Sequence, residues 1–139
     1  MAPGGGLDRG TWQAARRMHN MNNSSRCEGV YREQLTNITE RLAALGTKII
    51  FINTTPFMPL RTVGNTVVED MNAIAQEVVS KHISAPIVDL YGAVTKTCGK
   101  VYTDCPICRL HPCKFHYDDI GMNAQAAIVA AAITSVLAQ

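Results

Sequence analysis

A histidine near the end of the chain is the residue best suited to chemistry. His116 lies in the segment Cys-Lys-Phe-His-Tyr-Asp-Asp-Ile-Gly, which runs from Cys113 to Gly121 and precedes an alanine-rich stretch. An imidazole takes a proton from a hydroxyl near neutral pH, so a loop histidine ahead of a helix suits a general base. The structural alternative is a loop histidine that binds a backbone carbonyl. We predict His116 as the catalytic residue.

The cysteines around this histidine offer a second chemistry. Three sulfur donors and one imidazole fall within twelve residues, at Cys105, Cys108, Cys113 and His116. These are the ligand types of a tetrahedral zinc site, in which His116 could not act as a base. The alternatives are free thiols or a pair of disulfides, such as Cys98 with Cys105 and Cys108 with Cys113, that brace a long loop. Our main interpretation includes no metal and no cofactor.

Three aspartates have both a catalytic and a structural interpretation. Asp118 and Asp119 precede the last predicted helix, where a carboxylate caps the first turn or stabilises its positive end, and we favour this role. Asp89 ends a predicted strand, where it either points into a site or caps the following helix.

The helices that must position these residues follow from the hydrophobic pattern. Apolar residues at helical spacing predict amphipathic helices over residues 31–45 and 66–81. A short helix is expected over residues 91–97, and an alanine-rich helix over residues 123–137 closes the chain. Gly46 is expected to end the first helix.

Two apolar runs rich in β-branched residues predict strands between these helices. Residues 48–53 and 87–90 are continuous rather than alternating, which is typical of parallel strands buried on both faces. Residues 1–27 have no period and are expected to form an irregular arm, so that residues 28–139 make the folded half-domain. Because two strands leave hydrophobic edges open, the pattern suggests missing strands or self-association through these edges.

Residues 30–137 resemble the C-terminal half of the SGNH (GDSL-type) hydrolases. The string from His116 to Gly121 and the helix after it is similar to the family's last conserved block, in which Asp-x-x-His carries the catalytic pair. Upstream segments that look like the family's elements are Lys48-Ile49-Ile50-Phe51, Thr54-Thr55-Pro56, Asn72-Ala73-Ile74-Ala75 and Val88-Asp89-Leu90-Tyr91. The resemblance implies a partial three-layer α/β/α, flavodoxin-like fold with parallel strands. It also implies hydrolysis of carboxylic esters or carbohydrate O-acyl esters by a serine nucleophile, with His116 as the base.

Parts of that family's machinery have no counterpart in this sequence. The Gly-Asp-Ser nucleophile block and the Gly and Gly-x-Asn-Asp blocks of the oxyanion hole are absent, and Cys113 stands where the family has its catalytic Asp. A thiol supports an imidazolium only when it is ionised. We therefore expect a truncated C-terminal part that is inactive alone and, once completed, acts on a small-molecule or glycan ester. The alternatives are a non-catalytic zinc-binding or interaction module on the cysteine cluster, and a degenerate relative retained for binding.

Composition narrows the class of partner. The 139 residues are 47% hydrophobic and 17% charged, with 13 Lys+Arg, 11 Asp+Glu and a formal net charge of +2. The composition is that of a globular domain and excludes a phosphate-backbone binder of nucleic acid. The most apolar stretch, residues 124–138, is shorter than the ~20 residues of a membrane span, so we expect a packed helix instead.

The compartment is left open by two opposing signals. Cysteines and glycosylation tripeptides favour a secretory or extracellular location, and the tripeptides begin at Asn22, Asn23, Asn37 and Asn53. The first residues carry no recognisable signal peptide. Asn53 ends a predicted strand, so its tripeptide is expected to occur by chance, and Cys27 is the cysteine left over after two pairings.

Overall fold

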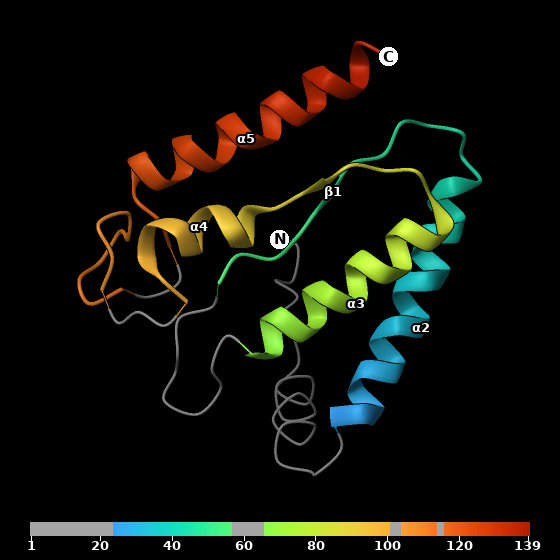
Figure 1. Ribbon diagram of the computed structural model, residues 1–139, viewed down its shortest axis with the longest axis horizontal. Coiled ribbons are helices and arrows are strands. Elements are labelled where there is room, and N and C mark those ends of the chain that lie inside the picture. The colour runs from blue at the N-terminus through green and yellow to red at the C-terminus, as the bar shows by residue number, and fades with distance from the viewer. Residues whose placement is uncertain (1–23, 57–65, 101–103, 114–115) are drawn as a thin grey trace, which may run out of the picture.

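The computed structural model describes residues 24–56, 66–100, 104–113 and 116–139, so most of the arm predicted over residues 1–27 lies outside the described residues. Within these ranges, helices and strands alternate (Figure 1). The elements are α2 (Ser24–Ala43), β1 (Phe51–Ile52), α3 (Thr66–His82), β2 (Ile87–Val88), α4 (Leu90–Cys98) and α5 (Asp119–Leu137). Each predicted helix and strand is therefore present, with shifted ends.

The two strands are parallel, as predicted, and they pair directly with each other. Phe51 lies opposite Ile87, and Ile52 lies opposite Val88. The ladder continues beyond the strands, because the Phe51 N–H donates to the Pro86 carbonyl and the Asn53 N–H to the Val88 carbonyl, each at 3.1 Å. Successive residues of a parallel strand bond to opposite sides, so Ile52 directs its backbone groups to the edge of β1 that no described strand covers.

The predicted three-layer α/β/α, flavodoxin-like fold is wrong for this chain. Within the described residues the structure is mostly helical, and its sheet has two strands of two residues each. Neighbouring strands lie about 4.8 Å apart, whereas a helix is about 10 Å wide, so this strand pair forms no layer of its own. The apolar runs at 48–53 and 87–90 are longer than the strands, because a residue counts as strand only where a partner pairs with it.

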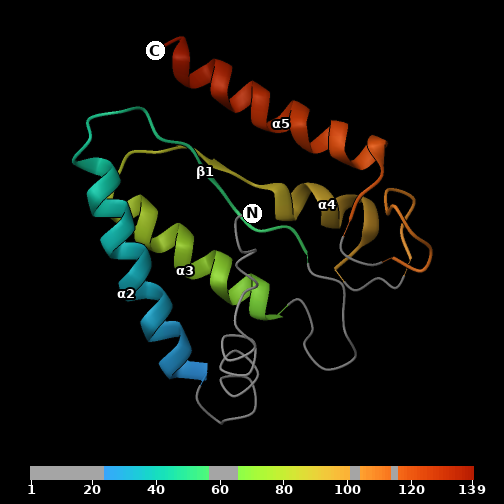
Figure 2. The same ribbon diagram turned by 180° about the vertical axis from the view of Figure 1, so that it is seen from behind.

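The helices flank the strand pair, with α2 and α3 on one side and α5 on the other (Figures 1 and 2). α2 and α3 pack against each other, and an ion pair of 2.8 Å between Arg32 and Glu77 joins them. The buried side of α3 consists of Ile74, Ala75, Val78 and Val79. The remaining buried aliphatic side chains among the described residues are Val88, Leu90 and Val94. The core is therefore small and centres on α3, β2 and α4.

The closing helix takes little part in this core. Gly121 is the buried residue of α5, and Ile120 and Leu137 are each 70% exposed. Among the described residues, α5 is the one helix long and apolar enough to cross a membrane, judged by length and composition alone. The sequence predicted a packed helix here. In the structure, α5 is an apolar helix that packs toward β2 with one side only.

Candidate functional site

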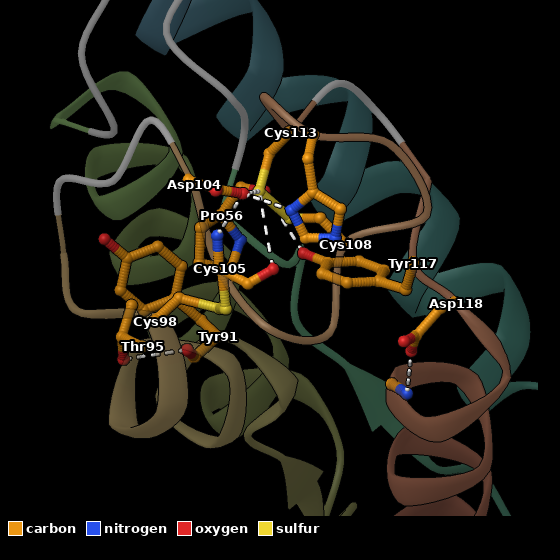
Figure 3. Close-up of a disulfide and its surroundings, with 12 residues drawn as sticks. Pro56, Tyr91, Thr95, Cys98, Asp104, Cys105, Cys108, Cys113, Tyr117 and Asp118 are labelled. Atoms are coloured by element: carbon orange, nitrogen blue, oxygen red, sulfur yellow. Dashed lines mark hydrogen bonds and ion pairs between the residues drawn. A yellow bond between two sulfur atoms is a disulfide. The ribbon is translucent and has the colours of Figure 1, made fainter.

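Two disulfides brace the loop between α4 and α5. Cys98 is bonded to Cys105 and Cys108 to Cys113, with Cα–Cα distances of 5.2 and 5.3 Å, and Cys27 is free (Figure 3). The first bridge ties the last residue of α4 to the loop, and the second closes the turn that follows. The disulfide interpretation of the cysteine cluster is confirmed, with the pairing given as its example.

The bridged sulfurs form a small core under this loop. Cys105, Cys108 and Cys113 are 3%, 3% and 5% exposed, and Cys98 and Ile107 pack against them. A zinc ligand must be a thiolate, so a zinc site on these cysteines would require both bridges to be reduced. A disulfide sulfur carries no charge, so Cys113 in this state cannot support an imidazolium in place of a carboxylate. Among the described residues, no group of three or more His, Cys, Asp or Glu side chains is placed to hold a metal ion.

The backbone holds His116 in place, while its side chain is exposed. The Arg109 N–H donates to the His116 carbonyl and the Asp118 N–H to the Ile107 carbonyl, both at 2.9 Å. Tyr117 forms an isolated antiparallel bridge with Cys108, so the segment at His116 is paired with a disulfide-bonded one. Within the part of the chain that the structure describes, the imidazole of His116 makes no hydrogen bond.

This segment lies toward the carboxyl end of the strand pair. The Tyr117 hydroxyl donates to the carbonyl of Pro56, which follows β1 by a few residues, at 3.5 Å (Figure 3). At the next residue, Asp118 accepts the Gly121 N–H at 2.8 Å and so begins α5. The loops at this end of parallel strands are where α/β proteins place catalytic groups. His116 thus lies toward the carboxyl end of the strand pair.

On the bridged loop, His111 has a carboxylate partner. Its Nδ1 makes a short hydrogen bond with Asp104 Oδ1, which also accepts the Cys105 N–H at 3.0 Å. This hydrogen bond from His111 is the main reason why the pKa of the Asp104 carboxyl lies below its ordinary value. A carboxylate on Nδ1 is the arrangement that orients a catalytic imidazole. Sequence reasoning missed this pair, because the contact depends on the path that the two bridges impose on the loop.

Asp89, Asp118 and Asp119 occupy the structural positions that the sequence suggested for them at the starts of helices. Asp89 is the N-cap of α4 and accepts the Gly92 N–H at 2.8 Å. It also accepts the Asn53 side-chain amide at 2.7 Å, and the Asn53 oxygen in turn accepts the Tyr91 N–H at 2.9 Å. Asp118 caps α5 as described, and Asp119 lies in the first turn of that helix. These hydrogen bonds fix the ends of the strands and the starts of the helices.

A tyrosine and a glutamate link α3 to α4 at the same end of the fold. The Tyr91 hydroxyl donates to Glu69 Oε1 at 2.8 Å, and Lys100 Nζ lies 3.2 Å from the same oxygen. Burial first, and then the bond to Glu69, raise the pKa of Tyr91 to about 12. The pKa of Glu69 is lowered, chiefly by the hydrogen bond from Tyr91. The phenol therefore stays protonated and acts as a donor.

The described serines do not gather near His116. Ser80 and Ser135 lie on the exposed surfaces of α3 and α5. Ser84 lines a cleft of about 320 Å³ that also includes Lys48, Pro86 and Val136. Lys48 precedes β1, Ser84 and Pro86 precede β2, and Val136 lies near the end of α5. The cleft therefore lies at the amino end of the strands, away from His116. No nucleophile for His116 is found among these serines.

Compared with known protein families, curated proteins and solved structures, the chain gives no match. The likeness to the SGNH hydrolases therefore rests on the sequence segments quoted above alone.

Proposed function

We propose that this chain is the C-terminal part of a serine ester hydrolase, that His116 is its general base, and that residues outside these 139 supply the nucleophile. The observation that carries the proposal is the exposed imidazole on a backbone held at the carboxyl end of the strands. The likeness of the His116–Gly121 segment to the family's last block supports it from the sequence.

The local structure suits a base that must stay in position. Backbone bonds from Arg109 and to Ile107 flank His116, and the Cys108–Cys113 bridge closes the opposite segment. A general base has to lie within hydrogen-bond reach of the proton that it removes, so a fixed backbone with a free ring is favourable. The ring would take the proton of the attacking hydroxyl and return it to the leaving alcohol. The substrate class that the resemblance implies is a carboxylic ester or a carbohydrate O-acyl ester.

The chain is expected to be inactive by itself. The position that matches the family's catalytic Asp holds Cys113, whose sulfur is bonded to Cys108. The described serines lie on other elements or at the other end of the strands. An imidazole without a nucleophile and an oxyanion hole has nothing to activate.

The test compares the chain with a form extended by its upstream coding sequence. We expect the 139 residues to resist a fluorophosphonate probe, and the extended form, which would carry a Gly-Asp-Ser block, to be labelled and to hydrolyse p-nitrophenyl acetate. His116→Ala should lower that hydrolysis by about 10²- to 10⁴-fold. His111→Ala is the matched control, because both histidines are exposed on the same loop. No labelling of the extended form would refute the proposal.

The same pair of variants separates two assignments of the base. If His111→Ala abolished hydrolysis and His116→Ala did not, the base would be His111, oriented by Asp104. The proposed role of His116 would then be wrong.

The bridged loop favours one second candidate, a non-catalytic interaction module. Two disulfides hold its backbone while His111 and His116 remain exposed, which is a rigid presentation of polar side chains. With the bridges intact we expect no stoichiometric zinc by elemental mass spectrometry. One zinc per oxidised chain would contradict the disulfide assignment.

A further inference from the structure

One of the glycosylation tripeptides lies on α2, with its first and third residues on opposite sides of the helix. Asn37 begins the tripeptide Asn37-Ile38-Thr39, and its side chain is exposed together with the polar neighbours Glu33 and Arg41, one turn before and after it. Thr39 is 2% exposed, and α3 is the helix that packs on α2 (Figure 1). Two residues turn a helix by about 200°, so Asn37 points into solvent when Thr39 is packed.

The side chain of Asn37 is free to carry a substituent. Within the part of the chain that the structure describes, its amide makes no hydrogen bond. Asn53 begins a similar tripeptide, but its amide donates to Asp89 at 2.7 Å and its oxygen accepts the Tyr91 N–H at 2.9 Å. An N-linked glycan is a bulky group on the amide nitrogen that belongs at a protein surface. The fold therefore accommodates a glycan at Asn37, whereas at Asn53 a glycan would crowd the nitrogen that is bonded to Asp89.

The two disulfides point to a compartment in which such a glycan is attached. Bridges such as Cys98–Cys105 and Cys108–Cys113 form and persist in oxidising surroundings, of which the lumen of the endoplasmic reticulum is one. Asn-x-Ser/Thr tripeptides of chains that enter this lumen are the acceptors of N-linked oligosaccharides. We propose that Asn37 is an N-glycosylation site of this protein and that its glycan projects from the exposed side of α2.

The covalent step joins Nδ2 of Asn37 to the anomeric carbon of an oligosaccharide that is carried on a polyprenyl diphosphate. The new C–N bond replaces the C–O bond to the diphosphate, which leaves as the anion, and the amide gives up one proton to solvent. The glycosyltransferase also requires the hydroxyl of the third residue, which in the folded chain is that of the buried Thr39. Transfer therefore precedes the packing of α2 on α3, and the helix forms afterwards with its glycan outside.

Mass spectrometry of the full chain, expressed in cultured mammalian cells behind a cleavable signal peptide, tests the site. Trypsin releases residues 33–41 as a peptide whose one asparagine is Asn37, which separates this tripeptide from the others. Peptide N-glycosidase in heavy-oxygen water first turns a glycosylated asparagine into a mass-labelled aspartate. In chain pooled from cells and medium, we expect the label in most copies of the peptide. Thr39→Ser should keep the label and Thr39→Ala should lose it, whether or not these variants fold, because attachment comes first. An unlabelled peptide in most copies, or a label that persists in Thr39→Ala, would overturn the proposal.

The folded state supplies two further tests. Chain made without a glycan and folded with both bridges should resist a microsomal glycosyltransferase and its polyprenyl-diphosphate donor, whereas the reduced and unfolded chain should be modified at position 37. Equal modification of the two states would refute transfer before folding. Glycosylated parent and Asn37→Gln chains from the same cells should melt within about 3 °C of each other, because the side chain of Asn37 is exposed. A larger loss of stability in the glycosylated parent would overturn the placement of the glycan in solvent.

Discussion

Removal of the Cys98–Cys105 bridge should destabilise the domain by about 3 kcal/mol. The bridge joins residues seven positions apart and so closes a loop of about eight residues. Without the bridge, the unfolded chain gains conformational entropy, which lowers its free energy by about 2.5 kcal/mol at 25 °C. Cys105 is 3% exposed, and replacing its sulfur by a methyl hydrogen in Cys98→Ala/Cys105→Ala gives up about 0.5 kcal/mol of apolar burial.

Thermal unfolding followed by circular dichroism measures this effect. In a domain of this length, 1 kcal/mol shifts Tm by about 3 °C, so the double variant should melt about 9 °C below the parent. Cys27→Ser is the control, because Cys27 is free and partly exposed, and it should melt within about 1 °C of the parent. The intact mass of the parent should show four hydrogens fewer than the fully reduced chain. An unchanged Tm in the double variant would refute the view that this bridge stabilises the domain.

Three further outcomes follow from the caps and hydrogen bonds. Asp118→Ala removes the side chain that accepts the Gly121 N–H and should cost about 1 kcal/mol in urea unfolding, with no change expected to contradict its role as a cap. The pKa of Tyr91 is raised to about 12 by burial and by its bond to Glu69, so the folded state holds the phenolic proton more tightly. Its contribution to stability should be complete below pH 10 and lost as the pH rises towards 12, and in Tyr91→Phe that loss should disappear from the pH dependence of unfolding. Asn53 is hydrogen-bonded to Asp89 and to the backbone, so expression through a secretory pathway should leave it without glycan by peptide mass spectrometry.

The helices were predictable from the spacing of their apolar residues, although α2 leaves Ile38, Leu42 and Leu45 exposed and α5 buries only Gly121. The ends of the helices were not predictable. The stripe that predicted a helix from residue 31 leaves out residues 24–30, which α2 includes. Those residues have few apolar side chains, and a helix that is already nucleated extends through them without a hydrophobic signal. α5 begins four residues before the predicted start because the Asp118 cap, rather than an apolar residue, sets its first turn.

The predicted fold class was wrong because it depends on pairing between strands that are far apart in the sequence. The runs at 48–53 and 87–90 correctly predict parallel strands, but Ile52 of β1 is 41% exposed, so the expected burial on both faces is wrong for β1. How many strands join them is a property of pairing over long distances, which these runs do not encode. The resemblance supplied a three-layer fold that the described residues do not form.

The candidate site also has features that the sequence predicted and features that it did not. The spacing of the cysteines was enough to suggest both disulfides, because five and seven residues are short loops to close. The contact between Asp104 and His111 was not predictable, because it depends on the path that the bridges impose on the loop. The sequence placed His116 in a loop ahead of the last helix, as the structure does, and its catalytic role stays a proposal.

The side chain of Asn72 limits how a strand from another molecule could pair with β1. Its oxygen accepts the Thr54 N–H at 2.9 Å and its amide donates to the Thr54 carbonyl at 2.8 Å, as a paired strand residue would. By the alternation along β1, Thr54 faces the same edge as Ile52, the one without a described neighbouring strand. A foreign strand that paired with Ile52 would find the backbone groups of Thr54 already bonded to Asn72. One amide of α3 thus shortens the length of β1 that is open to pairing.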